Sequence, residues 1–336
     1  MPSPTSENSR LLSIKNLRTY FYLPEGTVRA VDDVSFHVCR AEIVGLVGES
    51  GCGKSVTALS ILGLIPWPPG RIVDGRIMFQ GIDLTRLPPQ RLRDIRGNKI
   101  SMIFQEPMTS LNPVYTLGRQ IAEVYMEHQA VPKKEALERA QDMLDKLRIP
   151  APGKRIYEYP HNLSGGMRQR VMIAMALACN PQLILADEPT TALDVTIQAQ
   201  ILELTVELQR SLSTSILLIT HNLGIVAEYA QRVLVMYAGK IVEEAPVIPL
   251  FEEPLHPYTV GLLHSIPKLG SKAAAGKQRL SEIPGMVPSL NDLPPGCYFH
   301  PRCTRASSVC RTNEPELVEI SPGRRVACWA VADGWS

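Results

Sequence analysis

The chain has 336 residues, of which 45% are hydrophobic and 20% charged, and these proportions exclude a mainly disordered or fibrous protein. At roughly 150 residues per domain, the length suggests about two domains or one large domain with an appendage. The 35 basic and 33 acidic residues leave a net charge of only +2, so the overall charge does not indicate a nucleic acid partner.

Three apolar segments rich in β-branched residues are each followed by a segment with helical periodicity. In chain order, the expected strand and helix pairs are Glu42–Val47 with Ser55–Leu64, Gln182–Ala186 with Val195–Leu208, and Ser215–Thr220 with Leu223–Ala230. Strands that alternate with helices predict an α/β fold with a largely parallel central sheet. Between the first two pairs, Lys134–Leu147 has apolar residues on one helical face and charges on the other, which predicts a separate helical subdomain.

The composition changes near residue 246. Twelve of the 28 prolines lie between Pro246 and Pro322, and four of the seven cysteines lie from Cys297 onward. The small residues of Gly270–Lys277 are typical of a linker. These features predict an appendage after the α/β region.

Two further segments bear on the compartment. The longest apolar run, Val171–Cys179, is much shorter than the roughly 18 to 20 residues that cross a bilayer. Met1–Arg10 is polar and lacks the apolar core of a secretory signal. We therefore expect a cytoplasmic chain whose cysteines are mostly reduced.

A glycine-rich loop follows the first expected strand and precedes the first expected helix. It has the pattern GxxxxGKS and consists of Gly48, Glu49, Ser50, Gly51, Cys52, Gly53, Lys54 and Ser55, with Val56 continuing into the helix. Glycines let backbone N–H groups curl around phosphate oxygens, and the helix adds its positive N-terminal end. We expect Lys54 to reach the β and γ phosphates of a nucleoside triphosphate and Ser55 to hold Mg²⁺. The alternative is a glycine turn without a ligand.

Two adjacent carboxylates end the second expected strand. Asp187 can hold Mg²⁺, and Glu188 can orient or deprotonate a water molecule. A strand that ends in solvated acids is the alternative. Upstream, Leu163–Gly166 reads LSGG and opens a long helix, which in isolation also fits an ordinary capped helix start.

Taken together, the P-loop, LSGG, the ADEPT segment and His221 after its strand resemble the ABC ATPase family over about residues 11–245. The resemblance implies an ABC nucleotide-binding domain at 11–250 with a mixed sheet core, a helical subdomain at about 106–165 and an N-terminal antiparallel β subdomain. An irregular extension would follow at 251–336. In that family two cassettes hold two ATP molecules between them, head to tail.

The resemblance also implies roles for single residues. Ser164, Gly165 and Gly166 would act on the nucleotide of the partner cassette, and Asp194 would cross the interface. Gln105 would contact Mg²⁺ and the attacking water. His221 would contact the γ phosphate, and Phe21 would stack on the adenine. Tyr20 and Tyr22, which flank Phe21, are aromatic as well.

The implied reaction is hydrolysis of the β–γ phosphoanhydride of ATP. Glu188 would be the base, while Lys54, Mg²⁺ and the opposing LSGG would stabilise charge on the transferred phosphoryl group. Two residues depart from the usual pattern. Cys52 stands where serine is usual, and it either makes the site sensitive to thiol reagents or is simply a small side chain beside the phosphates. Asn222 stands where an aspartate usually follows the histidine.

Three stretches resemble a narrower group, the ATP-binding subunits of dipeptide and oligopeptide permeases: Ser101–Pro113, Glu188–Ala199 and His256–Thr259. The resemblance implies an ATPase that powers peptide import, peripheral on the cytoplasmic face of a bacterial inner membrane. Its partners would be a second ATPase, expected to be a paralogue, two transmembrane permease subunits and an extracytoplasmic solute-binding protein, with no nucleic acid. A groove at about 105–129 would receive a permease helix. The alternatives are import of nickel or another small solute, or a soluble ABC ATPase of DNA repair or translation.

Four cysteines form a separate candidate site in the extension. Cys297, Cys303, Cys310 and Cys328 are separated by five, six and seventeen residues. Four thiols in a reducing compartment more often bind metal than form disulfides. Since the set has no CxxC pair, a [4Fe–4S] cluster is favoured over zinc, and unliganded thiols are the third possibility. The spacing resembles the cysteine pattern of D-type dipeptide permease subunits, which implies such a cluster.

Overall fold

The computed structural model describes residues 9–106, 110–189, 195–265 and 283–332. The chain forms two compact units. The first comprises Met1–Leu11, Val38–Glu42 and Asp83–Leu218, and the second comprises Leu12–His37, Ile43–Ile82 and Ile219–Ser336. The second unit contains residues from both of the expected domains, 11–250 and 251–336. The boundaries of the two compact units are therefore not those of the expected domains. Among the described helices, none has the length and apolar character of a membrane span.

Three strands of mostly buried residues lie side by side, two of them wholly in the first unit and the third in it as far as Leu218. Their order is β8 (Ser215–Thr220), β7 (Leu183–Asp187) and β6 (Ile100–Ile103), and β6 pairs with β7 in parallel. Every residue of β7 and β8 is buried, which accounts for their continuous apolar sequences. The strands expected at 182–186 and 215–220 are confirmed within one residue.

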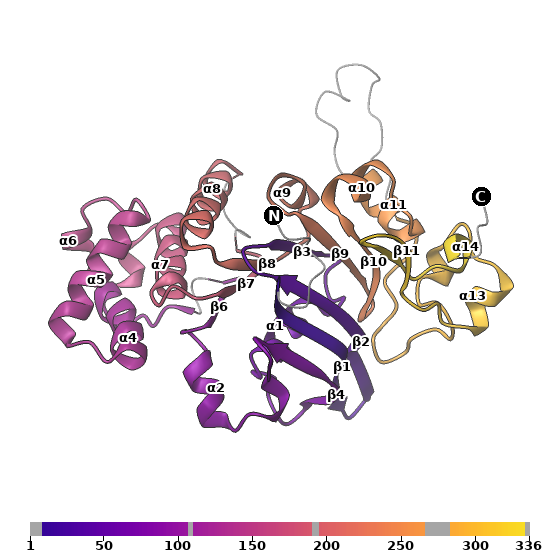
Figure 1. The fold of residues 1–336 in the computed structure, drawn as a ribbon, viewed down its shortest axis with the longest axis horizontal. Helices are drawn as coiled ribbons and strands as arrows, with labels where there is room; N and C mark the ends of the chain where they lie inside the picture. The colour runs from indigo at the N-terminus through magenta and orange to yellow at the C-terminus, as the bar shows by residue number, and fades with distance from the viewer. Residues whose placement is uncertain (1–8, 107–109, 190–194, 266–282, 333–336) are drawn as a thin grey trace, which may run out of the picture. The chain divides into compact units, whose positions relative to one another are not determined.

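Four helices of the first unit, α4, α5, α6 and α7, lie beside one another as the magenta group in Figure 1. The expected helix at 134–147 is confirmed as α5, and the long helix after LSGG as α7. α4 begins at Thr116, whose side chain accepts a hydrogen bond from the N–H of Arg119 at 3.4 Å. The bounds are η2 (Leu84–Arg86), α2 (Pro89–Ile95), α4 (Leu117–Gln129), α5 (Lys133–Lys146), α6 (Pro152–Arg155), η3 (Pro160–Asn162), α7 (Gly165–Leu177) and α8 (Val195–Leu212).

The second unit contains a mixed run of strands. β3 (Ile43–Val47) pairs in parallel with β9 (Arg232–Tyr237), whereas β9, β10 (Lys240–Pro246), β12 (Arg324–Val326) and β11 (Val318–Ser321) pair antiparallel in that order. The mixed sheet implied by the family resemblance is confirmed. The pairs β3–β9 and β6–β7 are parallel as expected, whereas β10, β12 and β11 add antiparallel pairs at one side of the sheet. The reason is local: β9 and β10 are joined by only Ala238 and Gly239, both with positive φ, and so short a turn connects antiparallel strands.

The N-terminal antiparallel sheet is also confirmed. Its strand order is β2 (Gly26–Cys39), β1 (Arg10–Leu23), β4 (Gly70–Phe79) and β5 (Ile82–Asp83). Leu12 lies opposite Phe79 and Ile14 opposite Ile77, all four buried, so alternate residues of β1 and β4 supply one apolar face.

The extension after residue 250 consists mostly of loops and short helices, but it is not entirely irregular. β12 continues the sheet because Glu243 of β10 lies opposite Val326. The linker expected at 270–277 lies outside the described residues. The remaining helices of the second unit are α1 (Lys54–Ile61), α9 (Leu223–Tyr229), α10 (Val247–Glu252), α11 (Pro257–His264), η4 (His300–Arg302), α13 (Ser308–Thr312) and α14 (Trp329–Ala332).

Candidate functional site

The glycine-rich loop joins β3 to α1 in the second unit. Gly48 and Gly53 have φ values of 154° and 106°. A Cβ at Gly48 would lie 2.1 Å from the carbonyl oxygen of Met236, and a Cβ at Gly53 would lie 2.1 Å from that of Ala30. Only glycine fits at either position, so the loop depends on both residues for its close approach to neighbouring backbone.

Lys54 begins α1, and its ammonium group is held inside the loop. Its Nζ donates hydrogen bonds to the carbonyl oxygens of Gly48 at 2.8 Å and Glu49 at 2.9 Å. The neighbouring Cys52 is fully buried, and burial raises the pKa of its thiol. A buried, protonated thiol is a poor nucleophile, which favours the view of Cys52 as a small side chain.

The two predicted acidic residues lie at the carboxyl end of β7 in the first unit. Asp187 is buried, and Glu188 is partly exposed with a φ of 45°. Gln105 follows the end of β6, and its Nε2 donates a hydrogen bond to Oε2 of Glu188 at 2.9 Å. Because β6 and β7 are parallel neighbours, their carboxyl ends meet at one edge and bring these residues together.

The LSGG segment opens α7, also in the first unit. Ser164 is the N-cap, and its Oγ accepts a hydrogen bond from the N–H of Met167 at 3.4 Å. One turn into the helix, the buried side chain of Gln169 donates to the carbonyl oxygen of Pro189, directly after Glu188. Sequence reasoning missed Gln169, although a polar residue on an otherwise apolar helix face was a usable signal.

Phe21 lies near the end of β1 and is partly exposed. Thr19, two residues earlier, makes a 2.8 Å hydrogen bond with Ser60 of α1. Residues two apart on a strand share a face, so Phe21 is on the α1 side of β1. Tyr20 is on the opposite face, where its hydroxyl donates to Asp32 at 2.7 Å. This register favours Phe21 over its tyrosine neighbours as the aromatic closest to the helix that follows the P-loop.

His221 directly follows β8 and is exposed. The next residue, Asn222, is the N-cap of α9 and accepts hydrogen bonds from the N–H groups of Gly224 at 3.0 Å and Ile225 at 3.4 Å. Asparagine therefore serves at this position as a helix cap. Asp194, the expected interface residue, lies outside the described residues.

Comparison with known proteins establishes the family. The family model described as "ABC transporter" matches residues 31–191, and the one described as "Oligopeptide/dipeptide transporter, C-terminal region" matches residues 242–310. "Probable peptide ABC transporter ATP-binding protein y4tR" from Sinorhizobium fredii is 55% identical over 95% of this chain and 94% of its own. "Oligopeptide transport ATP-binding protein AppD" from Bacillus subtilis is 54% identical over 96% and 97%. The chain belongs to the ABC transporter ATP-binding proteins.

Solved ABC cassettes share the fold of this ABC ATPase. The dimeric cassette MJ0796, in a post-hydrolysis state bound to ADP and Pi, aligns with a TM-score of 0.63 and 27% identity over 70% of this chain and 98% of that one. The cassette cbiO1 from Clostridium perfringens aligns with a TM-score of 0.61 and 26% identity over 73% and 92%. The predicted ATPase activity is thereby confirmed, and ATP with Mg²⁺ is the expected substrate.

The C-terminal region of this ABC ATPase contacts its phosphate-binding loop. Tyr258, from the HPYT segment, accepts a 2.9 Å hydrogen bond from the N–H of Glu49 through its hydroxyl. Arg302 donates to both carboxylate oxygens of Glu49, at 2.8 Å and 3.1 Å. The sequence predicts neither contact, because more than 200 positions separate Glu49 from its partners along the chain.

The four cysteines of the extension are free thiols. The N–H of Cys297 donates to the carbonyl oxygen of Cys310 at 2.9 Å. Burial, together with the nearby thiols of Cys310, Cys328 and Cys303, raises the pKa of Cys297 to about 11. Within the described residues, no group of three or more His, Cys, Asp or Glu side chains is arranged as a metal site.

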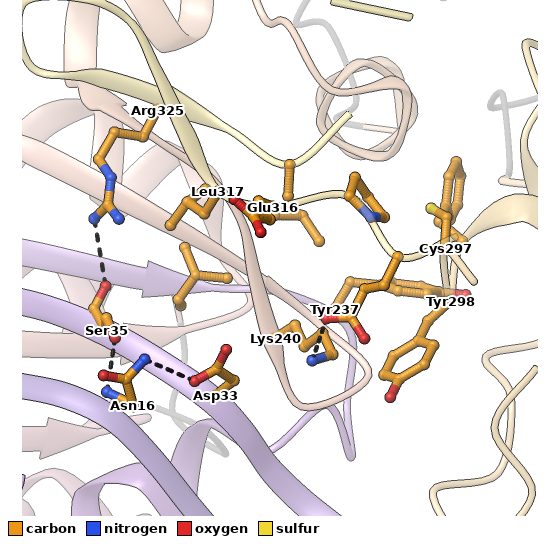
Figure 2. A pocket seen from close by; sticks show the side chains of 16 residues that line it. Asn16, Asp33, Ser35, Tyr237, Lys240, Cys297, Tyr298, Glu316, Leu317 and Arg325 are labelled. Carbon is orange, nitrogen blue, oxygen red and sulfur yellow. Dashed lines mark hydrogen bonds and ion pairs between the residues drawn. The ribbon is translucent and has the colours of Figure 1, made fainter. Parts of the chain in front are cut away.

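Cys297 also lines a cavity of about 520 Å³ in the second unit (Figure 2). On one side of it, Nζ of Lys240 lies 2.6 Å from the carboxylate of Glu314 and 5.3 Å from the ring centre of Tyr298. Tyr298 in turn donates to Asp32 at 3.1 Å. These contacts attach the cysteine-bearing loops to β10 and to the N-terminal sheet.

Proposed function

We propose that this chain is the ATP-hydrolysing subunit of an importer for dipeptides and oligopeptides. The observation that carries the proposal is the extent of identity with proteins of that name. Beyond the two relatives above, "Dipeptide transport ATP-binding protein DppD" from Bacillus subtilis is 50% identical over 95% of this chain and 94% of its own. The identity continues past the cassette into the C-terminal region, so shared ATPase motifs alone do not account for it.

In the proposed reaction, some residues of the chain bind ATP and others transfer a proton. The P-loop, with Lys54, binds the phosphates, and Phe21 stacks on the adenine. Glu188 accepts a proton from the attacking water, and the Gln105 amide holds its carboxylate in place. Ser55, Gln105 and Asp187 are the proposed ligands of Mg²⁺, which when bound neutralises charge on the β and γ phosphates. His221 contacts the γ phosphate.

The proposed assembly contains a second ATPase, expected to be a paralogue, two permease subunits and a solute-binding protein, at the cytoplasmic face of the bacterial inner membrane. Ser164–Gly166 and Asp194 would act across the interface between ATPases. A groove of about 420 Å³ in the first unit supports the predicted permease contact at 105–129. Its lining includes Asn112, Tyr115, Gln120, Glu123, Val124, Glu127 and His128.

We also propose that Cys297, Cys303, Cys310 and Cys328 bind a [4Fe–4S] cluster, with zinc as the alternative. Support comes from the spacing of the four cysteines and from the 2.9 Å hydrogen bond between the N–H of Cys297 and the carbonyl oxygen of Cys310, which brings two of their loops together. Thiolates are the ligands that iron–sulfur clusters use. ATP hydrolysis needs no electron, so the group would stabilise the extension or sense redox state.

Reconstitution of the importer tests the proposed function. The chain is expressed with its neighbouring permease and ATPase subunits, purified in detergent and placed in liposomes with the solute-binding protein. We expect ATP hydrolysis to rise when a dipeptide or oligopeptide is added, and labelled peptide to cross the membrane. Stimulation by nickel but not by peptide would assign a different solute, and an active ATPase that copurifies with no membrane subunit would contradict the transport assignment.

A further inference from the structure

Glu49 brings a carboxylate into the loop that binds phosphate. It is the second residue of the loop, and its carbonyl oxygen accepts one of the two hydrogen bonds from Lys54. An unpaired carboxylate beside a triphosphate opposes binding, because like charges at short range repel. The loop therefore needs a group that neutralises Glu49 or turns it away from the phosphates.

Arg302 is that group in this structure. Its side chain is only 4% exposed, and its two terminal nitrogens lie 2.8 Å and 3.1 Å from the two carboxylate oxygens of Glu49. This forked geometry is the strongest arrangement available to an arginine and a carboxylate. The salt bridge cancels the charge of Glu49 and fixes the direction of its side chain.

Arg302 is itself held rigidly. Its Nε donates to the carbonyl oxygen of Pro284 at 2.9 Å, and a terminal nitrogen donates to that of Ile283 at 3.3 Å. The guanidinium also lies 5.8 Å and 6.0 Å from the ring centres of Tyr237 and Phe299. Because these contacts restrain the guanidinium group of Arg302, it can set the position of the Glu49 carboxylate. An unrestrained arginine would instead adjust its own position to that of Glu49.

Tyr258 holds the main chain of Glu49 from the same side. Its hydroxyl accepts the Glu49 N–H at 2.9 Å, and its ring packs against both Tyr237 and Phe299, with centres 4.7 Å and 5.5 Å away. The extension thus contacts both the side chain and the backbone of one P-loop residue. These contacts lie within the second unit.

We propose that Arg302 is a positioning residue for ATP: by pairing with Glu49 it removes a negative charge from the phosphate-binding loop and makes nucleotide affinity depend on the C-terminal extension. The proposal rests on the ATPase activity of the chain and is independent of the transported solute. It predicts that the charges of Glu49 and Arg302 affect binding in opposite directions, which a purely structural salt bridge would not do.

The test measures the dissociation constant of the purified full chain for a non-hydrolysable ATP analogue with Mg²⁺. Arg302→Gln should raise it about tenfold at low ionic strength, and the effect should shrink in about 1 M salt. Glu49→Gln should leave it unchanged or lower it. The double variant Glu49→Gln/Arg302→Gln should return to within about threefold of wild type, because both charges are gone.

Arg324→Gln is the matched control, since Arg324 is a second arginine of the extension that pairs with Glu253 at 3.4 Å, away from the P-loop. It should not change the dissociation constant. In the reconstituted importer, Arg302→Gln should raise the KM for ATP, because the variant weakens nucleotide binding.

The proposal is overturned if Arg302→Gln binds nucleotide as tightly as wild type, or if the double variant binds as weakly as Arg302→Gln. Should Arg302→Gln not fold, Glu49→Gln is tested alone. Binding at least as tight as wild type supports the proposal, and weaker binding overturns it. Failure of the wild-type chain to bind nucleotide would count instead against the ATPase assignment.

Discussion

The amide of Gln105 donates a hydrogen bond to the carboxylate of Glu188 across 2.9 Å. The two residues are 83 positions apart in the chain, and parallel pairing of β6 with β7 brings them together. A donor on one carboxylate oxygen restrains the orientation of the whole carboxylate group. The bond therefore links the first residue of the segment expected to receive a permease helix with the proposed base.

The first prediction concerns the base itself. Glu188→Gln should lower ATP turnover about 10²- to 10⁴-fold, the usual contribution of a positioned general base. Nucleotide affinity should stay near wild type, because the variant preserves size and hydrogen bonding. Steady-state turnover and a binding titration on the same preparation provide the two values. Unchanged turnover would show that another group accepts the proton.

The second prediction separates orientation from proton transfer. Gln105→Ala removes the donor to Glu188 and should lower kcat by about tenfold, less than Glu188→Gln, because the base remains present. The double variant should be slower than Glu188→Gln by less than the tenfold that Gln105→Ala costs alone, since part of the effect of Gln105 acts through Glu188. Additive losses in kcat would mean that the two residues act independently.

The third prediction concerns pH and stability. His256 is buried, and burial lowers its pKa from 6.5 to about 3. Between these values the unfolded chain binds a proton that the folded chain does not, so stability present above pH 6.5 is lost as pH falls toward 3. The free energy of unfolding should fall by up to about 1.4 kcal/mol per pH unit from this group.

Replacing the histidine tests that slope. The Nδ1 of His256 accepts the N–H of Tyr258 at 3.0 Å, and asparagine can take over this capping role. His256→Asn should flatten the fall in denaturant midpoint between pH 6.5 and 4.5. The carboxylate of Glu243 accepts a hydrogen bond from the backbone N–H of His256. Because this carboxylate is present in both proteins, its own pH dependence cancels when the two slopes are compared. Identical slopes for both proteins would exclude His256 as the cause.

The fourth prediction concerns the groove in the first unit. Glu123 and Glu127 line it from one face of α4. Glu123→Lys/Glu127→Lys should reduce copurification with the permease subunits and lower transport, with unchanged nucleotide affinity, because the groove lies on the helical subdomain. Glu138→Lys, on an exposed position of α5 outside the groove, is the control. Loss of assembly in the control alone, or in neither variant, would assign the permease contact elsewhere.

The fifth prediction concerns the cysteines. Protein purified without oxygen should contain iron and sulfide and absorb visible light, and Cys303→Ser/Cys328→Ser should remove all three signals. Cys39→Ser, outside the extension, should keep them. Bound zinc without sulfide would favour the alternative metal. Absence of both metals from the wild-type protein would leave the thiols unliganded.

The sequence by itself determined the positions of the main strands and helices and the candidate residues at their ends. The reason is physical: buried strands need apolar runs, and phosphate loops need glycines where a Cβ would collide, as at Gly48 and Gly53. These requirements act over a few neighbouring positions, so they remain visible in a linear pattern.

Only the tertiary structure decided the mixed direction of the sheet, the bond between Gln105 and Glu188, and the pairing of Glu49 with Arg302. Glu49 and Arg302 are 253 positions apart, and each looks like an ordinary charged residue in its own surroundings. A salt bridge between distant segments needs a specific distance and orientation, which folding creates and local composition does not encode.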